Sequence, residues 1–412
     1  MSGPVYVVVG AGHAGAAAIA AMRTAGFAGR IVLIGEVPHA PYERPPLSKE
    51  VLLSPKAVQL PIYPDNYYEA HNVECHFGTC VEHIDSVVRQ LVFADGEVLS
   101  YDKLLLTTGS RARRYPLLDA LGEGVHLLRT LEDSWGLQKE LRPGRHLLVV
   151  GGGIIGLEVA ASAATLGLTV TVLERAPRLM TRGVPVPLAD TLRGLHEQHG
   201  VKFELSVELS EAVRGADGKF HLRAADGRVF EGDAILYGVG VQVNDELART
   251  AGVTIQDGVL VDELCRTSVP EIFAAGDIAR QYQPFVGATV RQETWANAMH
   301  QGSCAGQAMV TGKGSAPEVP WYWTDQYGVN FQVAGKYEAG EWITRGDVSS
   351  GKYMLFGLTD GCVIGAVAIN NGRDMKLAKL MISAEAKPDR EALCDLSVDL
   401  RKLKTGAVTT AG

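Results

Sequence analysis

The stretch that decides the fold is Val5-Tyr-Val-Val-Val-Gly10-Ala-Gly12-His-Ala-Gly15, followed by an alanine-rich run. The apolar residues predict a buried strand, and the alanine-rich run predicts a helix. Gly10 makes a tight turn, Gly12 lets a pyrophosphate approach the backbone, and Gly15 lets the helix pack on the strand. The first N–H groups of the helix are then free to bind phosphate. This strand–turn–helix unit predicts a dinucleotide-binding fold.

A second apolar stretch, Arg30-Ile-Val-Leu-Ile-Gly-Glu36, strengthens this interpretation. It ends at Glu36, roughly 20 residues after the glycines, where an acid binds ribose hydroxyls in such folds. A glycine motif alone is weak evidence, but strand, helix and acid stand in register here. We therefore expect Gly10, Gly12, Gly15 and Glu36 to belong to one nucleotide site.

The same unit recurs in His146-Leu-Leu-Val-Val-Gly151-Gly-Gly153-Ile-Ile155-Gly156, and the strand that follows its helix ends at Glu174. Two dinucleotide sites in one chain suggest two cofactors that face each other, the arrangement that hydride transfer requires. We expect the second site to be formed by Gly151, Gly153, Ile155, Gly156 and Glu174.

A third segment, Pro270-Glu-Ile-Phe-Ala-Ala-Gly-Asp277, indicates which cofactor each site takes. It is a strand that ends in small residues and an acid, and Asp277 could accept a hydrogen bond from a ribitol hydroxyl, which FAD has and NAD lacks. It follows the second unit, so the NAD domain interrupts a split FAD domain. Two linking segments end in small residues suited to a nearby cofactor, with Thr108 and Gly109 expected at FAD and Gly238 and Gly240 at NAD.

The expected fold class is therefore α/β, with two Rossmann-like dinucleotide-binding domains and a small C-terminal α+β domain. The expected parts are 1–110 and 241–319 for the FAD-binding domain, 111–240 for the NADH-binding domain, and 320–412 for the C-terminal domain. In the last part, short alternating stretches predict strands at 330–334, 352–356 and 362–367, followed by a helix near 374–382.

Composition narrows the function further. The 412 residues carry a formal net charge of −8, which argues against broad nucleic-acid binding because a phosphate backbone would be repelled. No basic or cleavable apolar segment precedes the first strand, and the nearly uncharged run 147–173 fits a strand–helix–strand unit better than a membrane span. We expect a cytoplasmic protein.

The six cysteines indicate neither a disulfide framework nor a metal site, because no CxxC pair occurs. Cys75 and Cys80 have the CxxxxC spacing of flavin disulfide reductases, but they lie in a stretch that reads as strand, turn and strand. We expect both to be buried structural thiols rather than a redox couple.

Four further segments are Pro41-Tyr-Glu-Arg44-Pro-Pro-Leu-Ser-Lys49, Leu128-Arg-Thr-Leu-Glu-Asp133, Arg291-Gln-Glu293-Thr294-Trp295-Ala-Asn-Ala298 and Pro320-Trp-Tyr-Trp323-Thr-Asp-Gln326. With the glycine motifs, they make the whole chain resemble the FAD-dependent ferredoxin reductases. That family includes rubredoxin and putidaredoxin reductases and the reductase components of bacterial aromatic-ring dioxygenases. One departure is Val243, where the family usually has proline before the asparagine.

The resemblance implies roles for particular residues. Arg44 and Lys49 would contact the flavin or its phosphates, and Lys49 would pair with Glu158 close to the reactive N5. Trp323 would lie near the isoalloxazine, so the expected catalytic residues are Lys49, Glu158 and Trp323. Glu293 would also contact FAD. Thr294 and Trp295 would lie on the pyrimidine side of the flavin, where the N–H groups of a helix N-terminus stabilise negative charge.

The nucleotide preference depends on Glu174, whose carboxylate can accept from both ribose hydroxyls and would repel the 2′-phosphate of NADPH. Arg175 and Arg178 follow it and leave an alternative open, because arginines can bind that phosphate or stack on adenine. We expect NADH as the substrate, with Arg175 at the edge of its site.

The predicted function is hydride transfer from NADH to FAD, followed by one-electron transfer to a small iron–sulfur ferredoxin, expected to be [2Fe-2S], or to a rubredoxin, in the service of an oxygenase. A terminal oxidoreductase such as an NADH oxidase is one alternative, but the segment 44–49 has no redox cysteine. A signalling flavoprotein that resembles apoptosis-inducing factor is another, but no basic DNA-binding surface is visible. The identity of the ferredoxin and the oligomeric state, monomer or dimer, stay open. Candidate docking cations are Arg111, Arg113, Arg114, Arg291, Lys376 and Lys379.

Overall fold

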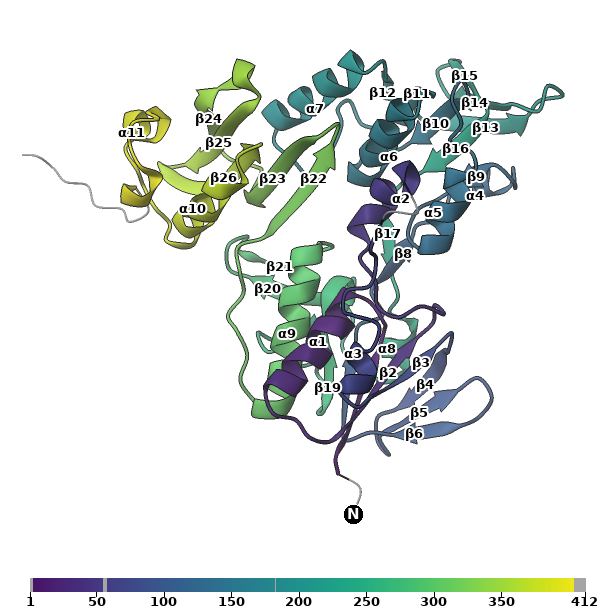
Figure 1. The fold of residues 1–412 in the computed structure, drawn as a ribbon, viewed down its shortest axis with the longest axis vertical. Coiled ribbons are helices and arrows are strands. Elements are labelled where there is room, and N and C mark those ends of the chain that lie inside the picture. Colours follow the sequence, from purple (N-terminus) through teal and green to yellow (C-terminus); the bar gives the residue numbers. More distant parts are fainter. Residues whose placement is uncertain (1–2, 55–57, 182, 404–412) are drawn as a thin grey trace, which may run out of the picture. The chain divides into compact units, whose positions relative to one another are not determined.

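A computed structural model describes residues 3–54, 58–181 and 183–403 (Figure 1). The chain divides into two compact units. The first contains Met1–Glu43, Gln59–Arg111 and Gln242–Pro320, and the second contains Arg44–Val58, Ala112–Val241 and Trp321–Gly412. Two of the passages of the chain from one unit to the other lie in strands β8 (Ser110–Ala112) and β17 (Val241–Val243).

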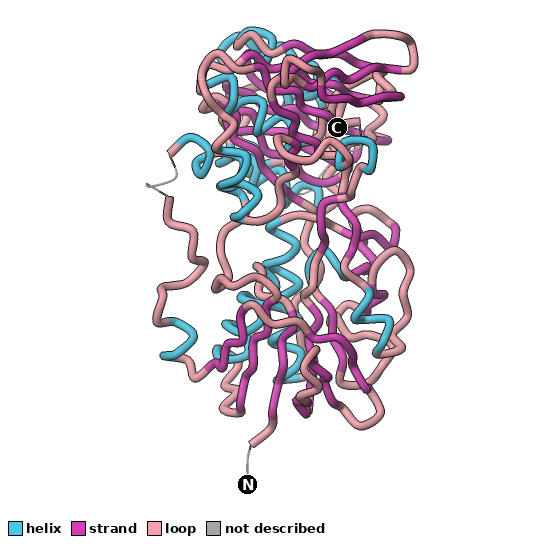
Figure 2. The backbone as a smooth tube through the Cα atoms, turned by 90° about the vertical axis from the view of Figure 1, so that its right-hand side faces the viewer, coloured by secondary structure: helices cyan, strands magenta, loops and turns pink. Residues whose placement is uncertain are grey.

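The first unit is built on a five-stranded sheet in the order β19-β7-β1-β2-β3, whose neighbouring strands are all parallel. Figure 2 shows strands of this unit alongside one another near the N-terminus. Four of its strands are short, mainly apolar runs, as expected for parallel strands buried on both faces, and the edge strand β3 is partly polar. They span β1 (Val5–Val9), β2 (Arg30–Gly35), β3 (Val73–Phe77), β7 (Lys103–Leu106) and β19 (Ile272–Ala274).

Two helices of this unit, α1 (His13–Thr24) and α9 (Trp295–Thr311), pack against each other at very short range (Figure 1). A Cβ atom on Gly302 would lie 2.2 Å from the carbonyl oxygen of Ala14, and one on Gly306 would lie 2.3 Å from that of Ala18. Only glycine therefore fits at these two positions of α9. The close approach fixes α1, whose first turn follows the glycine motif.

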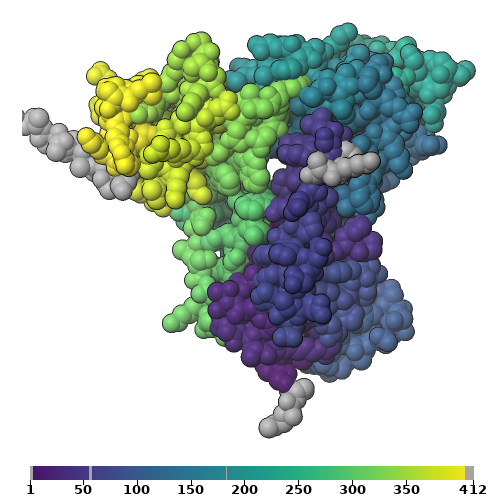
Figure 3. Space-filling view, in the orientation of Figure 1, coloured from purple at the N-terminus to yellow at the C-terminus, as the bar shows by residue number. Residues whose placement is uncertain are grey.

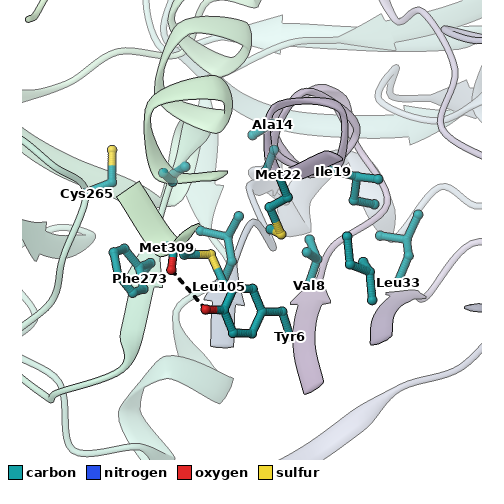
Figure 4. Close-up of a cluster of buried hydrophobic side chains, with 14 of the residues drawn as sticks. Tyr6, Val8, Ala14, Ile19, Met22, Leu33, Leu105, Cys265, Phe273 and Met309 are labelled. Carbon is teal, nitrogen blue, oxygen red and sulfur yellow. Dashed lines mark hydrogen bonds between the residues drawn. The ribbon is translucent and has the colours of Figure 1, made fainter. Parts of the chain in front are cut away.

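Beneath α1 lies an apolar core, which holds the helix on the sheet. Figure 4 shows Ile19 and Met22 of α1 pointing toward Val8 and Leu33 of the strands. At the edge of this core, the hydroxyl of Tyr6 donates to the carbonyl oxygen of Met309 at 3.0 Å.

The remaining elements of the first unit are smaller. They are α3 (Tyr67–Ala70), α8 (Glu246–Thr250), the 3-10 turn η2 (Gly276–Ile278), the antiparallel sheet of β4 (Val81–Asp85), β5 (Gln90–Phe93) and β6 (Val98–Ser100), and the sheet of β18 (Val259–Val261), β20 (Ala279–Gln283) and β21 (Ala288–Arg291).

The second unit repeats the parallel design in a sheet of order β12-β11-β10-β16-β9. Its strands are β9 (Val125–His126), β10 (His146–Val150), β11 (Thr169–Glu174), β12 (Lys202–Leu205) and β16 (Ala234–Tyr237). Its further elements are η1 (Pro45–Ser48), α2 (Glu50–Leu53), α4 (Pro116–Asp119), α5 (Leu131–Gln138), α6 (Ile154–Thr165), α7 (Val186–Gln198) and the antiparallel sheet of β13 (Leu209–Arg214), β14 (Phe220–Ala224) and β15 (Val229–Gly232).

The C-terminal part of this unit is an antiparallel sheet of order β22-β23-β26-β25-β24, the green-to-yellow region of Figure 3. Apolar side chains of this sheet and of α7 share one buried cluster, which includes Leu188, Leu192, Phe331 and Val333. The elements are β22 (Trp321–Gln326), β23 (Val329–Gly335), β24 (Glu341–Asp347), η3 (Val348–Ser350), β25 (Lys352–Thr359), β26 (Cys362–Ile369), α10 (Gly372–Ser383), α11 (Arg390–Cys394) and η4 (Leu400–Lys402).

The predicted fold class is confirmed: two parallel Rossmann-like sheets are followed by a C-terminal antiparallel sheet with helices. The second Rossmann sheet lies within the sequence of the first, since β19 joins the first sheet after β16 has completed the second. Among the described residues, no helix is both long enough and apolar enough to span a membrane.

Candidate active site

The first glycine turn, in the first unit, leaves no room for side chains. Gly10 has φ +120°, and a Cβ atom there would lie 2.2 Å from the carbonyl oxygen of Thr107. A Cβ atom on Gly15 would lie 2.3 Å from the carbonyl oxygen of Gly10. Gly12 is the N-cap of α1, so no side chain caps this helix, and its first turn contains no acid. The turn therefore leaves the N–H groups of α1 open to a phosphate group, which fits a dinucleotide.

Two predicted acids of the first unit lie at this turn. Glu36 is exposed directly after β2, and a Cβ atom on Gly35 would lie 2.6 Å from the Cβ atom of Ala11. Asp277 follows Gly276, whose own Cβ atom would lie 3.1 Å from that of Ala14 in α1. The fold thus brings both acids to the N-terminal end of α1 from segments that are far apart in the sequence.

Thr108 and Gly109 follow β7 beside this turn. The hydroxyl of Thr108 donates to the carbonyl oxygen of Asn244 at 2.7 Å, and the side-chain amide of Asn244 donates to the carbonyl oxygen of Thr108 at 2.9 Å. Gly109 has φ +67°, a left-handed conformation that favours glycine. On Asp277, Oδ2 accepts a hydrogen bond from the hydroxyl of Ser110 at 2.7 Å.

The N-terminus of α9 carries the predicted flavin-facing residues. Thr294 is its N-cap, and its hydroxyl accepts from the N–H of Asn297 at 3.2 Å. Glu293 is exposed and pairs with Arg291 at 2.6 Å.

The side chain of Trp295 makes a contact that was not predicted from the sequence. Its Nε1 donates to Oε2 of Glu43 at 3.0 Å, and the same oxygen lies 2.9 Å from Nε2 of His13. Burial opposes the ionisation of Glu43, but the hydrogen bond and charge interaction with His13, together with the hydrogen bond from Trp295, outweigh it and lower the pKa of Glu43. This carboxylate therefore links the first residue of α1 to the first residue of α9.

The second glycine turn, in the second unit, has the same construction. A Cβ atom on Gly151 would lie 2.4 Å from the carbonyl oxygen of Gly238, and one on Gly156 would lie 2.2 Å from that of Gly151. Gly153 is the N-cap of α6, and the space around a Cβ atom there is open to 4 Å, as it is at Gly238 and Gly240. The turn is thus tightly packed at Gly151 and Gly156 and open at Gly153, Gly238 and Gly240, which fits a ligand that lies against the backbone.

The first turn of α6 also presents an apolar side chain to solvent. Ile155 is 41% exposed, which is unusual for an isoleucine in an otherwise buried helix. Arg44 lies at the N-cap of η1 in the same unit and is half-buried.

Glu174 ends β11 and is held at the edge of this turn by two backbone groups. Its Oε2 accepts from the N–H of Gly152 at 2.6 Å, and its Oε1 accepts from that of Ala176 at 2.7 Å. The carboxylate is therefore fixed in place while each oxygen keeps a further lone pair for a ribose hydroxyl.

The two neighbouring arginines differ. The guanidinium of Arg178 donates to the carbonyl oxygens of Leu179, Thr181 and Val184 at 3.2 to 3.3 Å, so it holds its own loop together. Arg175 is exposed.

Lys49 and Glu158 meet in the second unit as predicted. Lys49 Nζ lies 3.0 Å from Glu158 Oε2, and the side chains are 11% and 5% exposed. Lys49 is placed by the segment before it, because the carbonyl oxygens of Leu47 and Ser48 accept from the hydroxyls of Ser134 and Ser162 at 2.7 and 2.8 Å. These bonds tie η1 to α5 and α6.

Three residues around this pair were not predicted. The hydroxyl of Ser48 donates to Oε2 of Glu158, and that of Thr324 donates to Oε1 at 2.7 Å. Gln326 in turn donates to Thr324 at 3.0 Å. Thr324 and Gln326 could have been found from the alternation of side chains along β22. Residues two apart in a strand share a face, and both of these side chains are buried.

The same alternation places Trp323 on the opposite face of β22 from Thr324. Its ring stacks on that of Trp321, with centroids 5.4 Å apart and planes at 21°. Lys379 Nζ lies 5.4 Å from the Trp321 centroid, a cation–π arrangement. Trp323 is therefore part of an aromatic pair on the face of the C-terminal sheet away from Glu158.

Neither Cys75 nor Cys80 is fully buried, contrary to the prediction. Both thiols are free, Cys75 is half-buried, and Cys80 is exposed because it follows β3 in the turn before β4. Burial raises the pKa of Cys75 to about 11, and burial also raises the pKa of Cys80. Neither thiol is activated as a thiolate. Within the described ranges, no cluster of three or more His, Cys, Asp or Glu side chains could hold a metal ion.

Three of the six candidate docking cations are already paired. Arg111 pairs with Glu246, Arg114 with Asp119, and Arg291 with Glu293. Arg113 donates to the carbonyl oxygen of Val241, Lys379 lies over Trp321, and Lys376 is exposed.

Comparisons with known proteins identify the family of this chain. Residues 4–302 match the family model described as "Pyridine nucleotide-disulphide oxidoreductase", and residues 321–404 match "Reductase C-terminal". The chain is 41% identical over 94% of its length to the 3-phenylpropionate/cinnamic acid dioxygenase ferredoxin–NAD(+) reductase component of Photorhabdus laumondii subsp. laumondii, 98% of which is covered. It is 38% identical over 97% of its length to the anthranilate 1,2-dioxygenase system ferredoxin–NAD(+) reductase component of Burkholderia cepacia, 99% of which is covered.

Among solved structures, the covalent putidaredoxin reductase–putidaredoxin complex matches with a TM-score of 0.92 and 31% identity, over 98% of both chains. Both the sequence and the fold are therefore shared along nearly the whole length. The chain belongs to the pyridine nucleotide-disulphide oxidoreductase family and, within it, to the FAD-dependent ferredoxin reductases.

Proposed function

We propose that this protein is a ferredoxin reductase that transfers hydride from NADH to bound FAD and passes the electrons singly to a small [2Fe-2S] ferredoxin. The observation that carries the proposal is the buried Lys49–Glu158 pair in a chain that also has two glycine turns shaped for dinucleotides. Bound FAD would supply the ability to accept two electrons together and to release them one at a time.

The residues present fit the two cofactors. In the proposed FAD domain, 1–110 with 241–319, the glycine turn at Gly10 would hold the pyrophosphate. In the proposed NADH domain, 111–240, the turn at Gly151 would hold the pyrophosphate of NADH. The proposed C-terminal domain is 320–412. Further proposed FAD contacts are Gly12, Gly15, Glu36, Arg44, Thr108, Gly109, Asp277, Glu293, Thr294 and Trp295. Further proposed NADH contacts are Gly153, Ile155, Gly156, Glu174, Arg175, Gly238 and Gly240.

Lys49, Glu158 and Trp323 are the proposed catalytic residues. Lys49 would place a positive charge against the flavin, where it offsets the negative charge that arrives with a hydride. Glu158 keeps this ammonium paired, because an unpaired buried charge would lose its proton or distort the site. Trp323 would present an aromatic face to the flavin.

Glu174 supports NADH over NADPH. Its carboxylate is fixed by Gly152 and Ala176 at the end of β11, where it can accept from ribose hydroxyls and would repel a 2′-phosphate. Arg178, one of the two arginines that could bind that phosphate, instead donates to carbonyl oxygens of its own loop. Of these two arginines, Arg175 is the one left to favour NADPH.

The relatives named as dioxygenase components support a finer proposal, that the ferredoxin served by this protein feeds an oxygenase of aromatic hydrocarbon catabolism. We also propose that the protein works in the cytoplasm, where its six free thiols would stay reduced.

Ferredoxin-dependent reduction of cytochrome c tests the proposal. NADH and purified protein alone should reduce cytochrome c slowly, and a [2Fe-2S] ferredoxin should raise the rate at least tenfold. If ferricyanide is reduced by NADH but no ferredoxin or rubredoxin is, the protein is an NADH oxidoreductase of another kind.

A further inference from the structure

A line of buried hydrogen bonds runs through the second unit and ends on Glu158. Oε1 of Glu158 accepts from the hydroxyl of Thr324 at 2.7 Å, and the oxygen of that hydroxyl accepts from Nε2 of Gln326 at 3.0 Å. Oε1 of Gln326 lies 2.6 Å from Nε2 of His196 in α7. All four side chains are buried.

The direction of every bond in this line is fixed by chemistry. The Thr324 hydroxyl gives its hydrogen to the carboxylate, so it can only accept from Gln326, whose NH2 group must face it. The amide oxygen of Gln326 therefore faces His196 and accepts from a hydrogen on Nε2. Nδ1 of a neutral His196 is then an acceptor, and the hydroxyl of Tyr327 lies 3.1 Å from it.

Burial keeps His196 neutral at ordinary pH, because it lowers the pKa of this side chain to about 4, although the bond to Gln326 acts in the opposite direction. The groups around the ring are few: Phe203 and Tyr327 contact it edge-on, with centroids 5.8 and 5.1 Å away, and the nearby His199 lowers the pKa of His196 further. Neutral His196 with its hydrogen on Nε2 therefore holds the amide oxygen of Gln326 toward itself and fixes the orientation of that amide.

The turn that carries Tyr327 is strained. Tyr327 and Gly328 join β22 to β23 as a two-residue hairpin loop, with φ +52° and +75°. This loop type favours Asn-Gly or Gly-Gly, and a tyrosine in the left-handed region is uncommon. Its hydroxyl is nevertheless held at His196, and its ring stacks on His199 at 3.7 Å.

These polar groups are not needed to hold α7 on the C-terminal sheet. The apolar cluster that includes Leu188, Leu192, Phe331 and Val333 already packs the helix against the sheet. Buried polar side chains generally cost stability unless every bond is made. The effect of these hydrogen bonds is instead on Glu158, because Thr324 donates to Oε1 of its carboxylate. That leaves Oε2 to Lys49 and Ser48.

We propose that Thr324, Gln326 and His196 are positioning residues that orient the Glu158 carboxylate toward Lys49, an inference that rests on the proposed function. Without the Thr324 hydroxyl, Oε1 would be buried without its donor. The carboxylate would then rotate to share Lys49 between both oxygens and draw the ammonium away from its place.

The test compares Thr324→Val, which removes the hydroxyl at nearly constant volume, with Thr324→Ser, which keeps it. In the purified FAD-loaded proteins, stopped-flow absorbance gives the rate of reduction by NADH, and equilibrium titration gives the midpoint potential of the flavin. Thr324→Val should slow reduction about ten- to a hundredfold, and it should move the midpoint potential in the same direction as Glu158→Gln. Thr324→Ser should restore most of the rate and the wild-type potential.

Two controls separate positioning from folding. Thr191→Val removes another hydroxyl between α7 and the C-terminal sheet, one that contacts Pro187 and Tyr353, and it should change neither rate nor potential. In a Glu158→Gln background, Thr324→Val should slow reduction less than twofold further, because the group it orients is already altered.

A second measurement needs no variant. Nitrogen-15 NMR of histidine-labelled wild-type protein should show His196 as the neutral Nε2–H tautomer at pH 7. A protonated ring or the Nδ1–H tautomer would overturn the bond directions. A Thr324→Ser variant as slow as Thr324→Val, or a Thr324→Val variant equal to wild type in rate and potential, would overturn the positioning role. Failure of NADH to reduce the wild-type flavin would instead overturn the proposed function, and this inference with it.

Discussion

The ammonium nitrogen of Lys49 lies 3.0 Å from Oε2 of Glu158, and both side chains are almost fully buried. The two residues come from η1 and α6, and hydrogen bonds from Ser134 and Ser162 to the backbone before Lys49 hold the segments together. A buried ion pair is costly to break, because the remaining charge has no water around it.

Removing the charge of Glu158 should therefore destabilise the protein. Glu158→Gln is expected to lower the free energy of unfolding by about 3 kcal/mol, measured by chemical denaturation at pH 7. The matched control is Glu197→Gln, which breaks the exposed pair with Arg193 and should cost less than about 0.5 kcal/mol. Equal small losses in both variants would mean that Lys49 is solvated.

Cofactor choice should depend on Glu174. Glu174→Ala removes the ribose acceptor and the repulsion of a 2′-phosphate, so KM for NADH should rise at least tenfold while KM for NADPH falls. Arg175→Ala should raise KM for NADPH and leave that for NADH nearly unchanged. Steady-state kinetics with ferricyanide measures both, and an unchanged NADH to NADPH ratio in Glu174→Ala would contradict the assignment.

Stability should decrease in mild acid because of His196. The pKa of this residue is about 4 in the folded protein and about 6.5 when unfolded, so the unfolded chain binds the proton first. The contribution is fully present above pH 6.5 and is lost toward pH 4. From pH 7 to pH 5 the loss from this one group should be about 2 kcal/mol.

His196→Gln, which lacks the titrating ring, should show a correspondingly smaller decrease between pH 7 and pH 5. Chemical denaturation of both proteins at the two pH values makes the comparison. Parallel decreases would show that His196 is not the group responsible.

The packing of α1 on α9 should tolerate no methyl group. Gly302→Ala places a Cβ atom 2.2 Å from the carbonyl oxygen of Ala14, which forces the helices apart at about 1–3 kcal/mol of stability. The shift should also weaken FAD retention, because Gly12 begins α1. Gly194→Ala in α7 is the control, since nothing lies within 4 Å of its Cβ position, and it should stabilise by about 0.5–1 kcal/mol.

The sequence was sufficient to predict the two parallel sheets and their nesting, because the glycine positions are dictated by local sterics. Gly10, Gly15, Gly151 and Gly156 each stand where a Cβ atom would meet a carbonyl oxygen. Such constraints are visible in any strand–turn–helix segment. The pairing of Lys49 with Glu158 was predicted from family resemblance and is present in the structure.

The surroundings of Glu158 could not be predicted in the same way. Thr324 lies 166 residues from Glu158 in the sequence, and His196 lies 130 residues from Gln326. Hydrogen bonds between such distant residues depend on how α6, α7 and β22 pack, and no local pattern encodes that packing. Cys80 was wrongly expected to be buried for the opposite reason, because a short turn between β3 and β4 exposes it.

The proposed function is best tested by anaerobic titration of the purified protein with NADH and then NADPH, followed by visible absorbance. The protein should be yellow, and about one equivalent of NADH should bleach its flavin, with a long-wavelength charge-transfer band and little response to NADPH. A protein that binds no flavin, or a flavin that neither nucleotide reduces, would contradict the proposed function.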